Sequence, residues 1–130
     1  MIEDTTFLID VMYGDEAALT RLEELEFDNI PEKISSVSVL ELWEGLYNVD
    51  DLEGERELIT EVIESKMIVA ADLEVMRSAG KLSGELRMNG KQIDREDCVI
   101  AATALHEDEP VLTRNTDHFQ RIESLTVETY

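Results

Sequence analysis

Acidic residues stand at three places where the ends of parallel strands would bring side chains together. Asp4 directly follows the short apolar start of the chain, and Glu41 lies one turn into a helix predicted after the second strand. Asp97 lies in the first turn of an almost wholly apolar helix, where the helix dipole stabilises negative charge. Converging carboxylates repel one another unless a cation neutralises them, and Mg²⁺ and Mn²⁺ prefer oxygen ligands. Because such an ion activates water and holds a phosphodiester, the pattern favours metal-dependent phosphodiester hydrolysis.

Each of these acids also has a purely structural interpretation. Asp4 could cap a helix, and Glu41 could be the capping-box partner of Ser38, three residues before it. Asp97 could simply be an acid favoured at a helix start, and Asp94 is closer to a cap than to a ligand. Both interpretations remain open from spacing alone.

Other catalytic chemistries are disfavoured. The two histidines, His106 and His118, are far apart in the sequence and Cys98 is the single cysteine, so a zinc site is not expected. The chain has no glycine-rich phosphate loop and no serine elbow. A phosphatase or response-regulator-like receiver also gathers acids at strand ends. A receiver would need paired acids after its first strand and a lysine after its last, and neither is present.

The charge balance is strongly acidic, with 31 Asp and Glu against 11 Lys and Arg and a net charge of −20 in 130 residues. This excludes a protein that coats nucleic acid in general, and the dispersed acids exclude an acidic tail. Mimicry of nucleic acid is possible, but we favour a halophilic composition. At ~1 M salt the Debye length is only ~3 Å, which would screen the self-repulsion, so we expect poor folding at low salt. A lone cysteine and no membrane-length apolar run favour a cytoplasmic protein with no membrane partner.

One segment departs from this balance. Between Arg77 and Arg95 five bases face only Glu85 and Asp94, a local charge of 5 − 2 = +3. The bases form either ordinary ion pairs on helix surfaces or a strip that meets RNA phosphates or the acidic end of a partner protein. Arg87, Lys91 and Arg95 from this strip, with Arg114, are the candidate contacts.

Helices and strands alternate along the chain as a single domain, residues 1–130. Strands are predicted at 1–4, 34–37, 67–69, 111–113 and 125–127, and helices at 7–12, 15–25, 38–47, 58–63, 73–88 and 94–106. This alternation predicts a parallel sheet covered by helices on both faces, with a site beyond the carboxyl ends of the strands.

Four blocks resemble the PIN-domain ribonucleases of the VapC toxin type. They are residues 1–10 (MIEDTTFLID), 38–46 (SVLELWEGL), 93–105 (IDREDCVIAATAL) and 111–119 (VLTRNTDHF), in the order of that family and over nearly the whole chain. The resemblance implies an α/β, PIN-like three-layer α/β/α fold with a short, mainly parallel central sheet. It also implies Mg²⁺- or Mn²⁺-dependent cleavage of RNA by a toxin. Homodimerisation and a VapB-type antitoxin are implied as well.

The same resemblance assigns residues. Asp4, Glu41 and Asp97 match the acidic core that holds the metal, and the fourth acidic position falls on Asn115. Asp117, two residues on, is expected to supply the missing charge as a further catalytic residue, while Thr6, Asp94 and Asn115 support the site. Because Asn115 departs from the acidic pattern, the alternative is a catalytically weak PIN-like binding module.

Overall fold

The computed structural model describes all 130 residues and contains a five-stranded, wholly parallel sheet in the order β3-β2-β1-β4-β5. The strands are β1 (Ile2–Glu3), β2 (Lys33–Ser35), β3 (Met67–Val69), β4 (Val111–Leu112) and β5 (Val127–Glu128). The predicted short parallel sheet is therefore confirmed, with strands slightly shorter than their apolar runs.

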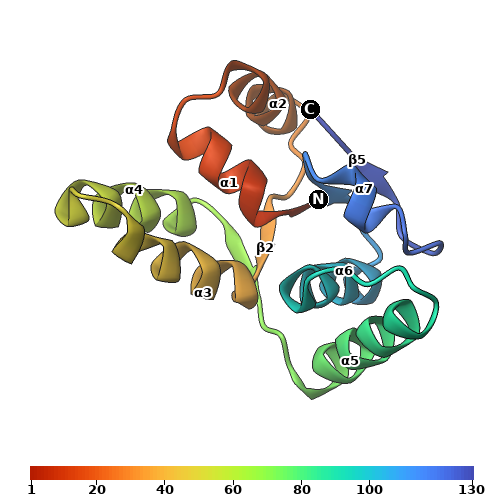
Figure 1. Ribbon diagram of the computed structural model, residues 1–130. Helices are drawn as coiled ribbons and strands as arrows, with labels where there is room; N and C mark the ends of the chain where they lie inside the picture. The colour runs from red at the N-terminus through yellow and green to blue at the C-terminus, as the bar shows by residue number, and fades with distance from the viewer.

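Helices cover both faces of the sheet, as predicted. They are α1 (Thr5–Met12), α2 (Glu16–Phe27), α3 (Ser36–Gly45), α4 (Leu52–Glu64), α5 (Leu73–Met88), α6 (Arg95–Glu107) and the short α7 (Thr116–Phe119), with a 3-10 turn at Leu46–Asn48. Figure 1 shows α5 and α6 together on one side and α1 to α4 on the other, and each side has its own hydrophobic cluster. No helix has the length and apolar character needed to cross a membrane.

The strand order places the site. From β1 the chain moves outward to β2 and β3, then returns to the other side of β1 with β4 and β5. Neighbouring strands β1 and β4 are thus where the winding direction reverses, and in open parallel sheets ligands bind beyond the carboxyl ends of the strands at such a point. Asp4 follows β1 and Thr113 follows β4, so both residues lie at this point.

Short polar side chains begin most of the helices. The carboxylates of Asp4, Asp15, Asp51 and Asp72 each accept a hydrogen bond from a backbone N–H in the first turn of the helix that follows. The predicted capping box of Ser38 and Glu41 is wrong. Helix α3 begins at Ser36, and Ser35 caps it by accepting from the Val37 N–H at 3.2 Å, so Ser38 lies inside the helix.

A buried ionic group lies behind the strand that carries Asp4. Glu3 is fully buried, and its Oε2 lies 3.1 Å from Nζ of Lys66, whose side chain is 2% exposed. Lys66 also pairs with Glu32. Burial raises the pKa of Glu3, whereas the ammonium group of Lys66 beside it lowers that pKa and favours the charged carboxylate. These residues join β1 to the segments that lead into β2 and β3.

Candidate active site

Asp4 is held at the end of β1 by three hydrogen bonds to its carboxylate. Oδ1 accepts from the Thr5 N–H at 2.8 Å, and Oδ2 accepts from the hydroxyls of Thr6 and Thr113, each at 2.7 Å. Asp4 is only 2% exposed, and burial raises the pKa of its carboxyl while the three donors lower it. Asp4 is therefore both the helix cap and an oriented carboxylate, and the Thr6 hydroxyl is one of the groups that orient it.

Glu41 reaches the same place from α3. Its Oε1 accepts a hydrogen bond from the Thr5 hydroxyl at 2.7 Å, and the hydroxyls of Thr5 and buried Ser38 lie 2.9 Å apart. Burial raises the pKa of Glu41 to about 7, helped by the negative charges of Asp4 and Asp97 and opposed by the Thr5 hydroxyl. The Thr5 hydroxyl of α1 thus holds the carboxylate of Glu41, which the capping-box interpretation had paired with Ser38.

Asp97 enters from the first turn of α6. Burial raises its pKa to about 6, against a hydrogen bond from His118, and the charges of Asp4 and Asp94 raise it further. Because Asp4 acts on Glu41 and Asp97, and Asp97 acts on Glu41, the three carboxylates are close enough to repel one another. The structure thus brings Asp4, Glu41 and Asp97 together.

The donor set fits a divalent cation. No lysine or arginine forms an ion pair with Asp4, Glu41, Asp94 or Asp97, although the chain forms eleven other salt bridges besides the His118–Asp97 contact. A divalent cation would neutralise this group of carboxylates, and oxygen ligands of this kind suit Mg²⁺ and Mn²⁺.

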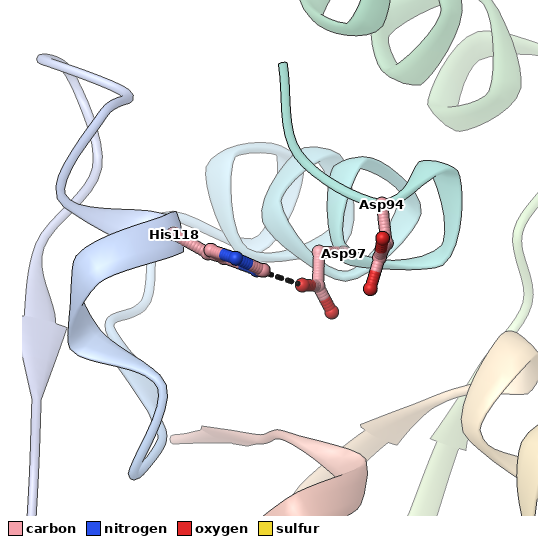
Figure 2. A group of neighbouring side chains, drawn as sticks. All are labelled: Asp94, Asp97 and His118. Carbon is pink, nitrogen blue, oxygen red and sulfur yellow. Dashed lines mark hydrogen bonds and ion pairs between the residues drawn. The ribbon is translucent and has the colours of Figure 1, made fainter. Parts of the chain in front are cut away.

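Two further side chains join Asp97 from different elements. Asp94 precedes α6 and His118 lies in α7, and one ligand atom from each of Asp94, Asp97 and His118 lies within 4.8 Å of the others. Figure 2 shows the two carboxylates side by side, with His118 facing Asp97 across a 3.1 Å contact. His118 was not among the predicted site residues because the two histidines are distant in sequence. The sequence signal that could have identified His118 is its position three residues after Asn115, a spacing that places both side chains on one side of a short helical turn.

Asn115 lies beside the acidic group, whereas Asp117 does not. The Asn115 backbone N–H donates to the Thr113 hydroxyl at 2.9 Å, and its side-chain Nδ2 lies 2.8 Å from His118 Nδ1, so Asn115 supports the site. The side chain of Asp117 is 83% exposed and pairs with Arg121 at 3.0 Å. The structure therefore does not bring Asp117 to the acidic group, because the α7 turn directs His118 there instead.

The basic strip is free of ion pairs. Six of the eleven Lys and Arg residues make ion pairs with acids. The remaining five are the strip residues Arg77, Lys81, Arg87, Lys91 and Arg95, all exposed. The interpretation of this strip as surface ion pairs is therefore wrong. Arg114, by contrast, pairs with Asp10 and Asp15 and lies 4.7 Å above the Tyr130 ring.

The metal-free protein is expected to lose stability as the pH rises. The native pKa values of Glu41 and Asp97 lie above their ordinary values, so the folded state binds protons more tightly than the unfolded state. Their contribution is complete at low pH and disappears as the pH passes through about 6 and 7. With a chelator and constant KCl, Tm should fall between about pH 5 and about pH 8, less so for Glu41→Gln. A Tm that rises over this interval contradicts the prediction.

A family model and several known proteins match most of the chain. The family model described as "PIN domain" matches residues 1–125. The chain is 29% identical over 131 residues to Ribonuclease VapC1 of Methanocaldococcus jannaschii, covering 100% of this chain and 86% of that protein. It is also 29% identical over 116 residues to Ribonuclease VapC19 of Mycobacterium tuberculosis, covering 89% of each.

Solved structures share the fold over nearly the whole chain. The VapBC2 structure from Rickettsia felis, bound to a promoter DNA fragment, has a TM-score of 0.89 at 24% identity and covers 99% of this chain and 97% of its own. DNA-bound VapBC from Salmonella typhimurium has a TM-score of 0.87 at 22% identity, covering 98% and 96%. At 24% and 22% sequence identity, these similarities show a shared fold only.

Proposed function

This chain belongs to the PIN domain family, and from that membership we propose that it is a divalent-metal-dependent ribonuclease of the VapC type. It would hydrolyse RNA phosphodiester bonds as the toxin of a toxin–antitoxin pair. The observation that carries the proposal is the meeting of Asp4, Glu41 and Asp97 without any lysine or arginine to neutralise them. The similar proteins named as VapC ribonucleases support the same activity. Residues 1–130 would form a single domain.

Each residue has a distinct part in this proposal. Asp4, Glu41 and Asp97 hold the ion, Mg²⁺ or Mn²⁺, which when bound supplies positive charge to the scissile phosphate and lowers the pKa of water. The hydroxyls of Thr5, Thr6 and Thr113 keep two of these carboxylates in place. The Asp97 carboxylate would also orient the attacking water. Asp117 has no part, because its side chain turns toward Arg121.

The test is cleavage of RNA at high KCl with Mn²⁺ or Mg²⁺, with and without a chelator. A panel of transfer, ribosomal and messenger RNA covers the substrate classes that a narrow nuclease would choose among. Cleavage that depends on the ion supports the proposal. A folded, ion-loaded protein that binds RNA from this panel without cutting it would instead be the catalytically weak binding module that Asn115 left open.

The unpaired basic strip is proposed to contact RNA phosphates. Arg87, Lys91 and Arg95 are exposed and unpaired in a chain with a net charge of −20, so they are available to replace the counterions of a phosphate backbone. Arg114 remains beside the site but is held by Asp10 and Asp15.

Arg87→Ala combined with Lys91→Ala should weaken RNA binding about tenfold and reduce its salt dependence by about two counterions. Circular dichroism should show an unchanged fold, because both side chains are exposed. The matched control is Arg56→Ala on α4, where an exposed arginine is lost far from the strip. Equal RNA affinities for the wild type and the double variant in a binding titration would reject the strip as the contact.

Protein partners follow from the same proposal. The similar solved structures contain VapBC complexes, which supports a VapB-type antitoxin as the partner of this chain. A homodimer is supported by the edge strand β3, which pairs only with β2 and leaves Met67 and Ile68 58% and 47% exposed.

We also propose that the acidic surface makes folding salt-dependent. Only six bases pair with acids among 31 Asp and Glu, so most of the negative charge repels itself. Raising KCl from about 0.1 M to about 2 M should raise Tm by about 10 °C, because the Debye length falls from about 10 Å to about 2 Å. Differential scanning calorimetry across KCl concentrations measures this effect. A Tm independent of KCl would remove the halophilic interpretation.

A further inference from the structure

His118 faces the acidic site but has no part in the chemistry proposed above. It lies in α7, and its Nδ1 is 3.1 Å from Oδ2 of Asp97. Ligand atoms of Asp94, Asp97 and His118 all lie within 4.8 Å of one another (Figure 2). The ring nitrogen of His118 therefore lies among carboxylate oxygens beyond the carboxyl ends of the strands.

The surroundings of Nδ1 are poorly satisfied by hydrogen bonds. The same nitrogen lies 2.8 Å from Nδ2 of Asn115, and one ring nitrogen either donates or accepts. The carboxylate of Asp97 needs a donor there, whereas the amide N–H needs a lone pair. A half-turn of the Asn115 amide exchanges its nitrogen and oxygen. When the hydrogen of the neutral imidazole is on Nε2, Nδ1, the amide oxygen and the Asp97 carboxylate then all present lone pairs to the same place, which a cation satisfies.

Asp94 gives an independent indication. Four other aspartates at helix N-caps accept a backbone hydrogen bond, but Asp94 at the N-cap of α6 makes no such bond. Its carboxylate also forms no ion pair, and it turns toward Asp97 instead (Figure 2). A capping residue that does not cap is free to act as a ligand.

We infer that Nδ1 of His118 is a direct ligand of the site's ion, together with Asp97 and Asp94. As a result the centre takes a first-row transition-metal ion in preference to Mg²⁺. Mg²⁺ is bound by oxygen ligands, whereas imidazole favours first-row transition metals. Neighbouring ligands of an octahedral ion with bonds of about 2.1 Å lie about 3 Å apart, which agrees with the Nδ1–Oδ2 contact. The inference rests on the proposed function only in requiring that an ion is bound.

The test is electron spin-echo envelope modulation of Mn²⁺ bound to the tag-free protein in frozen solution, which detects directly coordinated ¹⁴N. The wild type should show imidazole ¹⁴N coupling. His118→Asp should still bind Mn²⁺ but lose the coupling, and its preference for Mn²⁺ over Mg²⁺ in competition titrations should fall about tenfold. His106→Ala is the matched control because His106 is the other histidine of the chain. It bonds Ser78 near the far end of α6, and its loss should leave the coupling intact.

Each outcome decides the inference. Mn²⁺ bound to the wild type without ¹⁴N coupling would mean that Nδ1–H only donates a hydrogen bond to Asp97, and the inference fails. RNA cleavage measured on the same samples separates this failure from that of the ribonuclease, because activity without ¹⁴N coupling leaves the proposed function standing. A wild type that binds no Mn²⁺ and cleaves no RNA would overturn both.

Discussion

Asp4→Asn should reduce metal-dependent RNA cleavage by about a thousandfold or more while leaving the protein folded. Asp4 is the buried carboxylate at the point where the sheet reverses its winding, and Thr5, Thr6 and Thr113 orient it. An amide keeps the shape of the side chain but removes the negative charge that holds a divalent ion. Single-turnover cleavage, Mn²⁺ titration and circular dichroism on the same preparation measure activity, ion binding and fold.

Two other aspartates provide the controls. Asp50→Asn changes an exposed residue between the 3-10 turn and α4 and should leave cleavage unchanged. Asp117→Asn decides between the two placements of the fourth charge, since the sequence favours Asp117 as catalytic and the structure pairs it with Arg121. We expect near-normal cleavage from Asp117→Asn. Full metal-dependent activity of Asp4→Asn would remove Asp4 from the site.

Lys66→Met should destabilise the fold by about 3–5 kcal/mol. Lys66 is almost completely buried and pairs with Glu3, which is fully buried, and with Glu32. Without the lysine, the carboxylates of fully buried Glu3 and partly buried Glu32 would face each other with no cation between them. Denaturant unfolding at constant high KCl should report the loss, and Tm should fall by about 10–20 °C.

A double variant keeps this prediction separate from simple loss of packing. Glu3→Gln combined with Lys66→Met removes one charge of each sign, so it should recover much of the stability that Lys66→Met loses. If the double variant is as unstable as Lys66→Met, the loss comes from the missing aliphatic chain of the lysine. A Lys66→Met protein within about 1 kcal/mol of the wild type would show that this pair contributes little.

Local patterns in the sequence were sufficient for most of the elements, although the short helix α7 was not predicted and α4 begins at Leu52, before the predicted helix at 58–63. The helix over residues 73–88 and the strand over 67–69 have the same bounds in the structure, because apolar periodicity and capping residues act within a few neighbours. Asp4, Glu41 and Asp97 could also be proposed, since each lies at a predicted strand end or helix start. The start of α3 was misplaced because Ser35, Ser36 and Ser38 all have the chemistry of a cap.

The resemblance of four blocks to a known family supplied what spacing alone left open. Asp4, Glu41 and Asp97 lie in three of those blocks, and each had a structural interpretation that was equally consistent with its neighbours in sequence. The structure shows that these interpretations overlap, because Asp4 both caps α1 and faces the site.

The sequence by itself determined the alternation of elements, the acidic charge and the three carboxylates. Only the tertiary structure decided which side chains meet. Thr113 reaches Asp4 across 109 positions, Thr5 reaches Glu41 across 36, and His118 replaces Asp117 at Asp97. Glu3, Lys66 and Glu32 become one buried group in the same way. Parallel pairing of strands that are far apart in the chain creates these contacts, and the spacing of residues along the sequence does not predict them.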